Sequence, residues 1–152
     1  MRLAPNQCLP KAQSLIGHFM TTRILIADDS RTVRHSLHGL LEQHLEWKVC
    51  ADAIDGADAI AKAQQFTPDI IVLDFFMPGM TGVEAARILK KVLPSVPILI
   101  VTLEITAQLV EQAKSVGIRG AVQKSDTSEV LKGIEALLRQ ETFFDGKQSR
   151  TT

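Results

Sequence analysis

Five polar residues of this sequence directly follow four short apolar runs. The residues are Asp28, Asp29, Asp74, Thr102 and Lys124, and the runs before them are residues 24–27, 70–73, 98–101 and 120–123. If these runs are parallel strands of one sheet, their carboxyl ends meet at one edge, where open α/β sheets bind ligands. Three carboxylates, a hydroxyl and an ammonium would then share one small site, and that combination suits a divalent cation and a phosphoryl group.

The chemistry of such a site follows from its charges. Closely packed carboxylates repel one another, and a bound cation removes the conflict. Oxygen ligands without His or Cys favour a hard ion such as Mg²⁺. Lys124 can neutralise an anion beside the metal, and Thr102 can donate a hydrogen bond to that anion. Asp74 interrupts the apolar stretch 70–77, and a carboxylate can attack phosphorus, so we predict phosphoryl transfer onto Asp74.

Each of these residues taken alone has a simpler explanation. Asp28 and Asp29 could supply negative charge at the start of a helix, and Asp74 could belong to a turn. Thr102 could be an ordinary strand-end threonine, and Lys124 an ordinary solvated lysine. Their joint placement after four apolar runs favours the shared site.

The elements that must position these residues alternate along the chain. From Arg23 onward, short β-branched runs are followed by apolar residues at helical spacing, five times over. Ser30, Thr81 with Glu84 three residues later, Thr106, and Asp126 or Thr127 are typical starts of helices. This alternation predicts an α/β fold, a parallel doubly wound sheet with helices on both faces. We divide the chain into a disordered leader (1–21), one domain (22–141) and a C-terminal tail (142–152).

Composition excludes several other classes of protein. Lys+Arg and Asp+Glu both number 17, so no basic excess indicates nucleic-acid binding by this chain alone. No apolar run approaches the roughly 20 residues of a membrane-spanning helix. Cys8 and Cys50 form no disulfide framework, and His38 and His44 lack the spacing of a helical metal-binding pair. We therefore expect a cytoplasmic protein without a membrane association.

The segment from Arg23 to Arg139 resembles a response-regulator receiver domain of bacterial two-component signalling, similar to the chemotaxis-type receivers. The matching motifs are Ile26-Ala27-Asp28-Asp29-Ser30, Asp74-Phe75-Phe76-Met77-Pro78-Gly79-Met80-Thr81-Gly82, Val101-Thr102 and Lys124. Gly117 and Gly120, followed by Lys124, Ser125 and Asp126, look more like receivers that precede a helix-turn-helix DNA-binding domain.

The resemblance implies a five-stranded parallel sheet of order 2-1-3-4-5, a flavodoxin-like three-layer sandwich. It implies that Asp74 accepts a phosphoryl group from the phosphohistidine of a sensor histidine kinase. Asp29 and Asp74 would bind Mg²⁺ directly, with Asp28 acting through water and the backbone carbonyl of Phe76 completing the ligands. Mn²⁺ would be able to substitute.

The resemblance also implies how the signal leaves the domain. Thr102 and Lys124 would contact the phosphoryl oxygens and report phosphorylation. Output would go to a partner through the surface of the fourth helix, fifth strand and fifth helix, and a homodimer is compatible with it. Such a domain phosphorylates and dephosphorylates itself and is not an enzyme for an external substrate.

Two positions depart from the pattern of receivers. Receivers often carry Tyr or Phe three residues before the lysine, where this chain has Ala121. The sequence contains no tyrosine at all. Many receivers have Pro after the lysine, across a cis bond, where this chain has Ser125. Since a non-proline cis bond costs about 2.5–4 kcal/mol, we expect a trans bond between Lys124 and Ser125.

Three functions compete for this sequence. The first is a phosphorylatable receiver, and the second, motivated by Ala121, is a receiver-like binding module that works without phosphorylation. The third, a Mg²⁺-dependent phosphohydrolase, is disfavoured because Phe75 and Phe76 follow Asp74 where a second general acid would be needed. No output-domain pattern follows Leu138, so a single-domain regulator and a piece of a longer protein both stay open.

Overall fold

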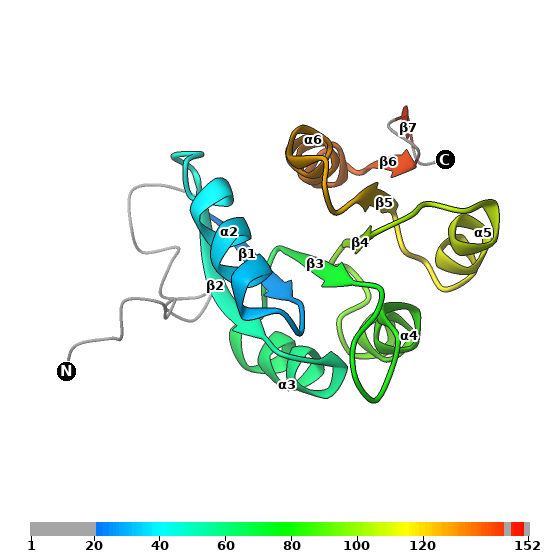
Figure 1. The fold of residues 1–152 in the computed structure, drawn as a ribbon, viewed down its shortest axis with the longest axis horizontal. Helices are drawn as coiled ribbons and strands as arrows, with labels where there is room; N and C mark the ends of the chain where they lie inside the picture. Colours follow the sequence, from blue (N-terminus) through cyan, green and yellow to red (C-terminus); the bar gives the residue numbers. More distant parts are fainter. Residues whose placement is uncertain (1–20, 145–146, 151–152) are drawn as a thin grey trace.

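The computed structural model describes residues 21–144 and 147–150, which form one sheet flanked by helices (Figure 1). The strands are β1 (Thr22–Ala27), β2 (Trp47–Ala53), β3 (Ile70–Asp74), β4 (Ile98–Thr102), β5 (Gly120–Gln123), β6 (Glu141–Phe144) and β7 (Lys147–Arg150). The helices are α2 (Arg31–Leu41), α3 (Gly56–Phe66), α4 (Gly82–Val92), α5 (Ala107–Ser115) and α6 (Thr127–Leu138). Residues 1–20 of the predicted leader lie outside the described residues.

The sheet has the order β2-β1-β3-β4-β5-β6-β7. Strands β1 to β5 are parallel in the predicted order 2-1-3-4-5, and the strand order reverses between β1 and β3. The carboxyl ends of β1 and β3 therefore lie at the switch point, where such sheets bind ligands.

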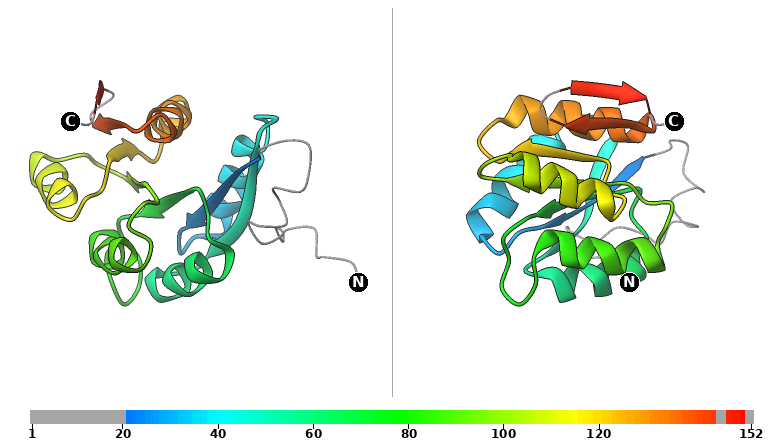
Figure 2. Two further views of the ribbon diagram at one scale, coloured as in Figure 1. Left: turned by 180° about the vertical axis from the view of Figure 1, so that it is seen from behind. Right: turned by 90° about the vertical axis from the view of Figure 1, so that its right-hand side faces the viewer.

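The prediction of five strands was wrong. Strand β6 pairs parallel with β5, and β7 pairs antiparallel with β6, as the right-hand view of Figure 2 shows. The sheet thus includes residues 142–144 and 147–150, which the sequence analysis assigned to a tail. Two adjacent aromatic side chains explain the extension, because Phe143 and Phe144 are 2% and 8% exposed and bury themselves in different cores.

Two hydrophobic cores lie on opposite faces of the sheet. One packs α3, α4 and α5 against the sheet, and the other packs α2 and α6 against the opposite face (Figure 1). Strands β3 and β4 are buried at every position because helices cover both of their faces. This burial explains why they read as continuous apolar runs rather than alternating ones. Cys50 is buried, as its place in an apolar run predicts.

Each helix begins with a side chain that accepts a hydrogen bond from the backbone of its first turn. These N-cap residues are Ser30, Asp55, Thr81, Thr106 and Asp126. Such a cap typically stabilises a helix by about 1 kcal/mol. The caps fix where each helix starts and so limit the loops at the carboxyl edge of the sheet.

In the part of the chain that the structure describes, no helix is long and apolar enough to cross a membrane.

Candidate metal and phosphoryl site

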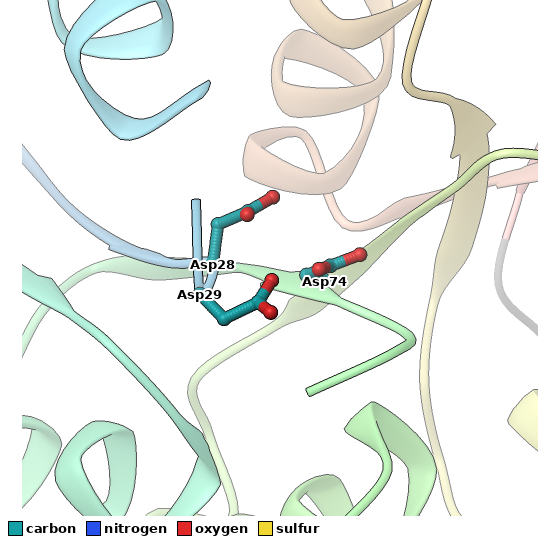
Figure 3. A group of neighbouring side chains, drawn as sticks. All are labelled: Asp28, Asp29 and Asp74. Carbon is teal, nitrogen blue, oxygen red and sulfur yellow. The ribbon is translucent and has the colours of Figure 1, made fainter. Parts of the chain in front are cut away.

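Three carboxylates converge at the carboxyl edge of the sheet. Asp28 and Asp29 follow β1, and Asp74 is the last residue of the neighbouring β3 (Figure 3). One oxygen of each carboxylate lies within 4.8 Å of those of the other two. Asp28 and Asp74 are buried and Asp29 is exposed. This geometry confirms the prediction from the sequence that the three carboxylates lie together at one edge of the sheet.

Lys124 joins the carboxylates from the end of β5. Its Nζ lies 2.7 Å from Oδ2 of Asp28 and 3.3 Å from Oδ2 of Asp74. Burial alone would lower the pKa of the Lys124 ammonium, but the carboxylates of Asp28 and Asp74 outweigh burial and raise that pKa. Lys124 therefore stays charged and holds two carboxylates that would otherwise repel one another.

Asp74 is the carboxyl whose protonation the site disturbs most clearly. Burial, and then the negative charge of Asp28, raise the pKa of Asp74 from its ordinary 3.8 to about 6, against the opposing charge of Lys124. The ammonium thus compensates only part of the negative charge. A cation bound among the three carboxylates would reverse the shift, because it favours the ionised form of each of them.

The donor set fits a hard divalent cation. Three carboxylates against one ammonium leave two negative charges uncompensated when all are ionised. The donors that converge are oxygens, which are the ligands that Mg²⁺ takes. Phe76 lies two residues beyond Asp74 and is 64% exposed, so it is not part of the buried wall of the site.

The loop after β3 is held close to Asp74 by its backbone. The N–H of Phe75 donates to the carbonyl of Val101, and the N–H of Gly82 donates to the carbonyl of Phe75 at 2.7 Å. Glycine is required at 82, because a Cβ there would lie 2.5 Å from the carbonyl oxygen of Asp74. The start of α4 therefore packs directly against the end of β3 and fixes the backbone of Asp74.

Thr102 ends β4, beside Asp74 in the sheet. Its side chain is buried, and its hydroxyl donates to the carbonyl of Glu104 at 3.2 Å. The carbonyl of Thr102 accepts the N–H of Lys124 at 2.7 Å. The ends of β4 and β5 are thus joined by a hydrogen bond at the residues predicted to sense an anion. A groove of about 490 Å³ opens beside Thr102 and is lined also by Phe75 and Phe76.

Sequence reasoning missed the residues that hold the loop after β1. Arg34 donates from Nη1 to the backbone carbonyl of Asp28 at 2.8 Å and from Nε to Asp52 at 3.1 Å. The N–H of Ser30 donates to Oδ1 of Asp28 at 2.8 Å. The only local signal was the position of Arg34 in the first turn after the N-cap, and the contact with Asp52 depends on the pairing of β1 with β2.

The two departures from the receiver pattern have clear structural outcomes. The bond between Lys124 and Ser125 is trans, as predicted. Ala121 is buried in β5, and Phe144 of β6 lies opposite it in the strand register. Phe144 belongs to the same core as Ala121, and its ring centroid lies 5.0 Å from Nζ of Lys114 on α5. An aromatic ring is thus present on this face, but a neighbouring strand supplies it.

Comparisons with known proteins agree with this geometry. Residues 24–137 match the family described as the response regulator receiver domain. The chain is 31% identical over 127 residues to the response regulator protein VraR of Staphylococcus aureus, covering 83% of this chain and 61% of VraR. The chain therefore spans less than two thirds of the length of this relative.

Solved structures give the same result. A LuxR-family two-component response regulator from Aurantimonas sp. SI85-9A1 matches with a TM-score of 0.76 and 35% identity, over 78% of this chain and 86% of that one. A LuxR-family DNA-binding response regulator from Staphylococcus aureus matches with a TM-score of 0.71 and 27% identity, over 77% and 98% respectively. The chain thus belongs to the response regulator receiver domain family of two-component signalling.

Proposed function

We propose that Asp74 accepts a phosphoryl group from the phosphohistidine of a sensor histidine kinase in a Mg²⁺-dependent reaction. The observation that carries this proposal is the convergence of Asp28, Asp29, Asp74 and Lys124 at one edge of the sheet. We assign the receiver to residues 22–141 and place the reaction in the cytoplasm.

The reaction transfers phosphorus from nitrogen to oxygen. A carboxylate oxygen of Asp74 attacks the phosphorus, and the bond between phosphorus and the imidazole nitrogen breaks, with its electron pair leaving on that nitrogen. Asp28, Asp29 and Asp74, with the backbone carbonyl of Phe76, would hold Mg²⁺. When bound, the metal would neutralise charge on the phosphoryl oxygens. Attack by water on the phosphorus later restores the Asp74 carboxylate.

Lys124 and Thr102 respond to the added phosphoryl group. Lys124 moves its hydrogen bonds from the Asp74 carboxylate to a phosphoryl oxygen, because the phosphorylated carboxyl of Asp74 has lost its own negative charge. The Thr102 hydroxyl, which donates to the Glu104 carbonyl at 3.2 Å, then donates to a phosphoryl oxygen instead, because a charged oxygen is the stronger acceptor. These shifts at the ends of β4 and β5 pass to the surface of α5, β5 and α6, where an output partner binds. The protein signals in this way and turns over no external substrate.

The test is phosphorylation by a small phosphodonor. Incubation with Mg²⁺ and acetyl phosphate should add one phosphoryl group per chain, as measured by intact mass spectrometry. Asp74→Asn should abolish the addition, and Asp58→Asn should keep it, because Asp58 pairs with Lys62 on α3. Removal of Mg²⁺ with a chelator should also stop it. Unmodified wild-type protein in the presence of both reagents would overturn the proposal.

Ala121 supports a second candidate, a receiver-like module that binds its partner without phosphorylation. If Asp74→Asn retains full partner binding and signalling, this alternative replaces the first proposal.

A further inference from the structure

Strand β6 lies beyond the part of the chain that matches the receiver family. The match ends at residue 137, and β6 begins at Glu141. It joins the sheet through only two register pairs with β5, Gly120 with Phe143 and Ala121 with Phe144. It covers an edge of β5 that would otherwise be open, and β7 pairs with its other edge, as Figure 1 shows.

The aromatic side chains of β6 pack into the hydrophobic cores on both faces of the sheet. Phe143 enters the core beneath α6, and Phe144 enters the core on the opposite face, beside α5. The acceptor strand offers small residues here, since a Cβ on Gly120 would lie 2.8 Å from the carbonyl oxygen of Phe143. The N–H of Phe143 donates to the carbonyl of Arg119 at 3.0 Å. One short strand thus buries two aromatic rings, one on each face.

The connection into β6 is short and strained. Only Arg139 and Gln140 separate the end of α6 from β6. Gln140 has φ of 64°, in the left-handed region that normally takes glycine at the end of a helix. Its N–H donates to the carbonyl of Leu137 at 3.0 Å and closes the reversal of the chain. Straightening this hinge would relieve the strain and carry β6 away from its own β5.

We propose that the edge of β5 is a docking site for β6 of a second copy of this chain, which gives a strand-exchanged dimer. Strand β6 fits the edge of β5 within one chain, and a second copy of the chain carries the same strand. The contacts of Phe143 and Phe144 are identical within one chain and between two chains, so only the hinge at Gln140 distinguishes the two states. A short strained hinge favours exchange. The proposal needs no phosphorylation, and its failure leaves the proposed function untouched.

Substitutions of the hinge test the exchange. Gln140→Gly adopts the left-handed conformation without strain and therefore stabilises the monomer. The association constant of the dimer should fall about tenfold for each of the two hinges, hence about a hundredfold in total. Gln140→Pro cannot adopt a positive φ and should shift the chain to the dimer. Thr67→Gly is the matched control, because Thr67 is the other non-glycine residue with positive φ in the described part of the chain and ends α3. It should leave the wild-type equilibrium unchanged.

The assay is light scattering during size-exclusion chromatography of the full chain over a range of concentrations. Dimer in Gln140→Pro should disappear when Phe143→Ala and Phe144→Ala are added, and it should persist with Asp74→Asn. A folded Gln140→Pro variant that stays monomeric would overturn the proposal, and so would a dimer that survives loss of both phenylalanines. If Gln140→Pro fails to fold, as judged by Trp47 fluorescence, equal dimerisation of wild type and Gln140→Gly is the overturning result.

Discussion

Substitution of the proposed acceptor should stabilise the metal-free protein. The pKa of Asp74 is raised from 3.8 to about 6, mainly by burial and by the charge of Asp28. Between these two values the native state binds a proton that the unfolded state has released, so the free energy of unfolding falls as the pH rises through this window. Asp74→Asn keeps the shape of the side chain and removes the charge that causes this loss.

The magnitude follows from the pKa difference. A change from 3.8 to about 6 corresponds to about 3 kcal/mol of unfolding free energy, which is fully present below pH 3.8 and fully lost above about pH 6. We therefore expect Asp74→Asn to be more stable than wild type by about 3 kcal/mol at pH 7.5 without metal. The difference should shrink toward zero as the pH falls below 3.8, the ordinary value for an aspartate.

Urea unfolding with a chelator present, followed by Trp47 fluorescence or circular dichroism at several pH values, measures this difference directly. Asp58→Asn serves as the control, because Asp58 lies on α3 and pairs with Lys62 away from the site. Added Mg²⁺ should nearly cancel the difference between the two proteins: at a hundredfold excess over its dissociation constant it stabilises the wild type by about 2.7 kcal/mol. A variant less stable than wild type at pH 7.5 without metal, or a difference independent of pH, would refute the reasoning.

Three further substitutions test other parts of the site and fold. Lys124→Met leaves the buried carboxylates of Asp28 and Asp74 without their ammonium; we expect a loss of about 3 kcal/mol in urea unfolding without metal, largely restored by Mg²⁺. Gly82→Ala places a Cβ 2.5 Å from the Asp74 carbonyl oxygen and should destabilise the fold by about 1–3 kcal/mol and slow phosphorylation by acetyl phosphate. Thr106→Ala removes the N-cap of α5 and should cost about 1 kcal/mol in thermal unfolding while phosphorylation stays unchanged.

The site could be predicted from the sequence because its positions are set by backbone geometry alone. Strands β3 and β4 are buried on both faces and therefore appear as unbroken apolar runs. A polar residue at the end of such a run must lie at the carboxyl edge of a parallel sheet, and Asp74 and Thr102 do so. The helix starts at Ser30, Thr81 and Thr106 were equally accessible, since capping depends on residues three positions apart.

The rest depended on contacts between distant segments. Phe143 and Phe144 stand next to a polar stretch, and a pair of aromatic residues does not reveal which strand it will join. Their place was decided by Gly120, whose missing Cβ lets the backbone of β6 approach. The role of Arg34 could not be predicted either, because its guanidinium connects the loop after β1 with Asp52 on β2, and this contact depends on how the two strands pair. Neither contact leaves a periodic signal in the sequence.

The central claim is that Asp74 carries the phosphoryl group, and chemical mapping of the modified residue tests it most directly. After incubation with Mg²⁺ and acetyl phosphate, borohydride reduces an acyl phosphate to an alcohol, and peptide mass spectrometry locates the reduced residue. We predict a single reduced aspartate at position 74, dependent on Mg²⁺. Reduction at Asp28 or Asp29 instead, or no reduced aspartate at all, would contradict the assignment.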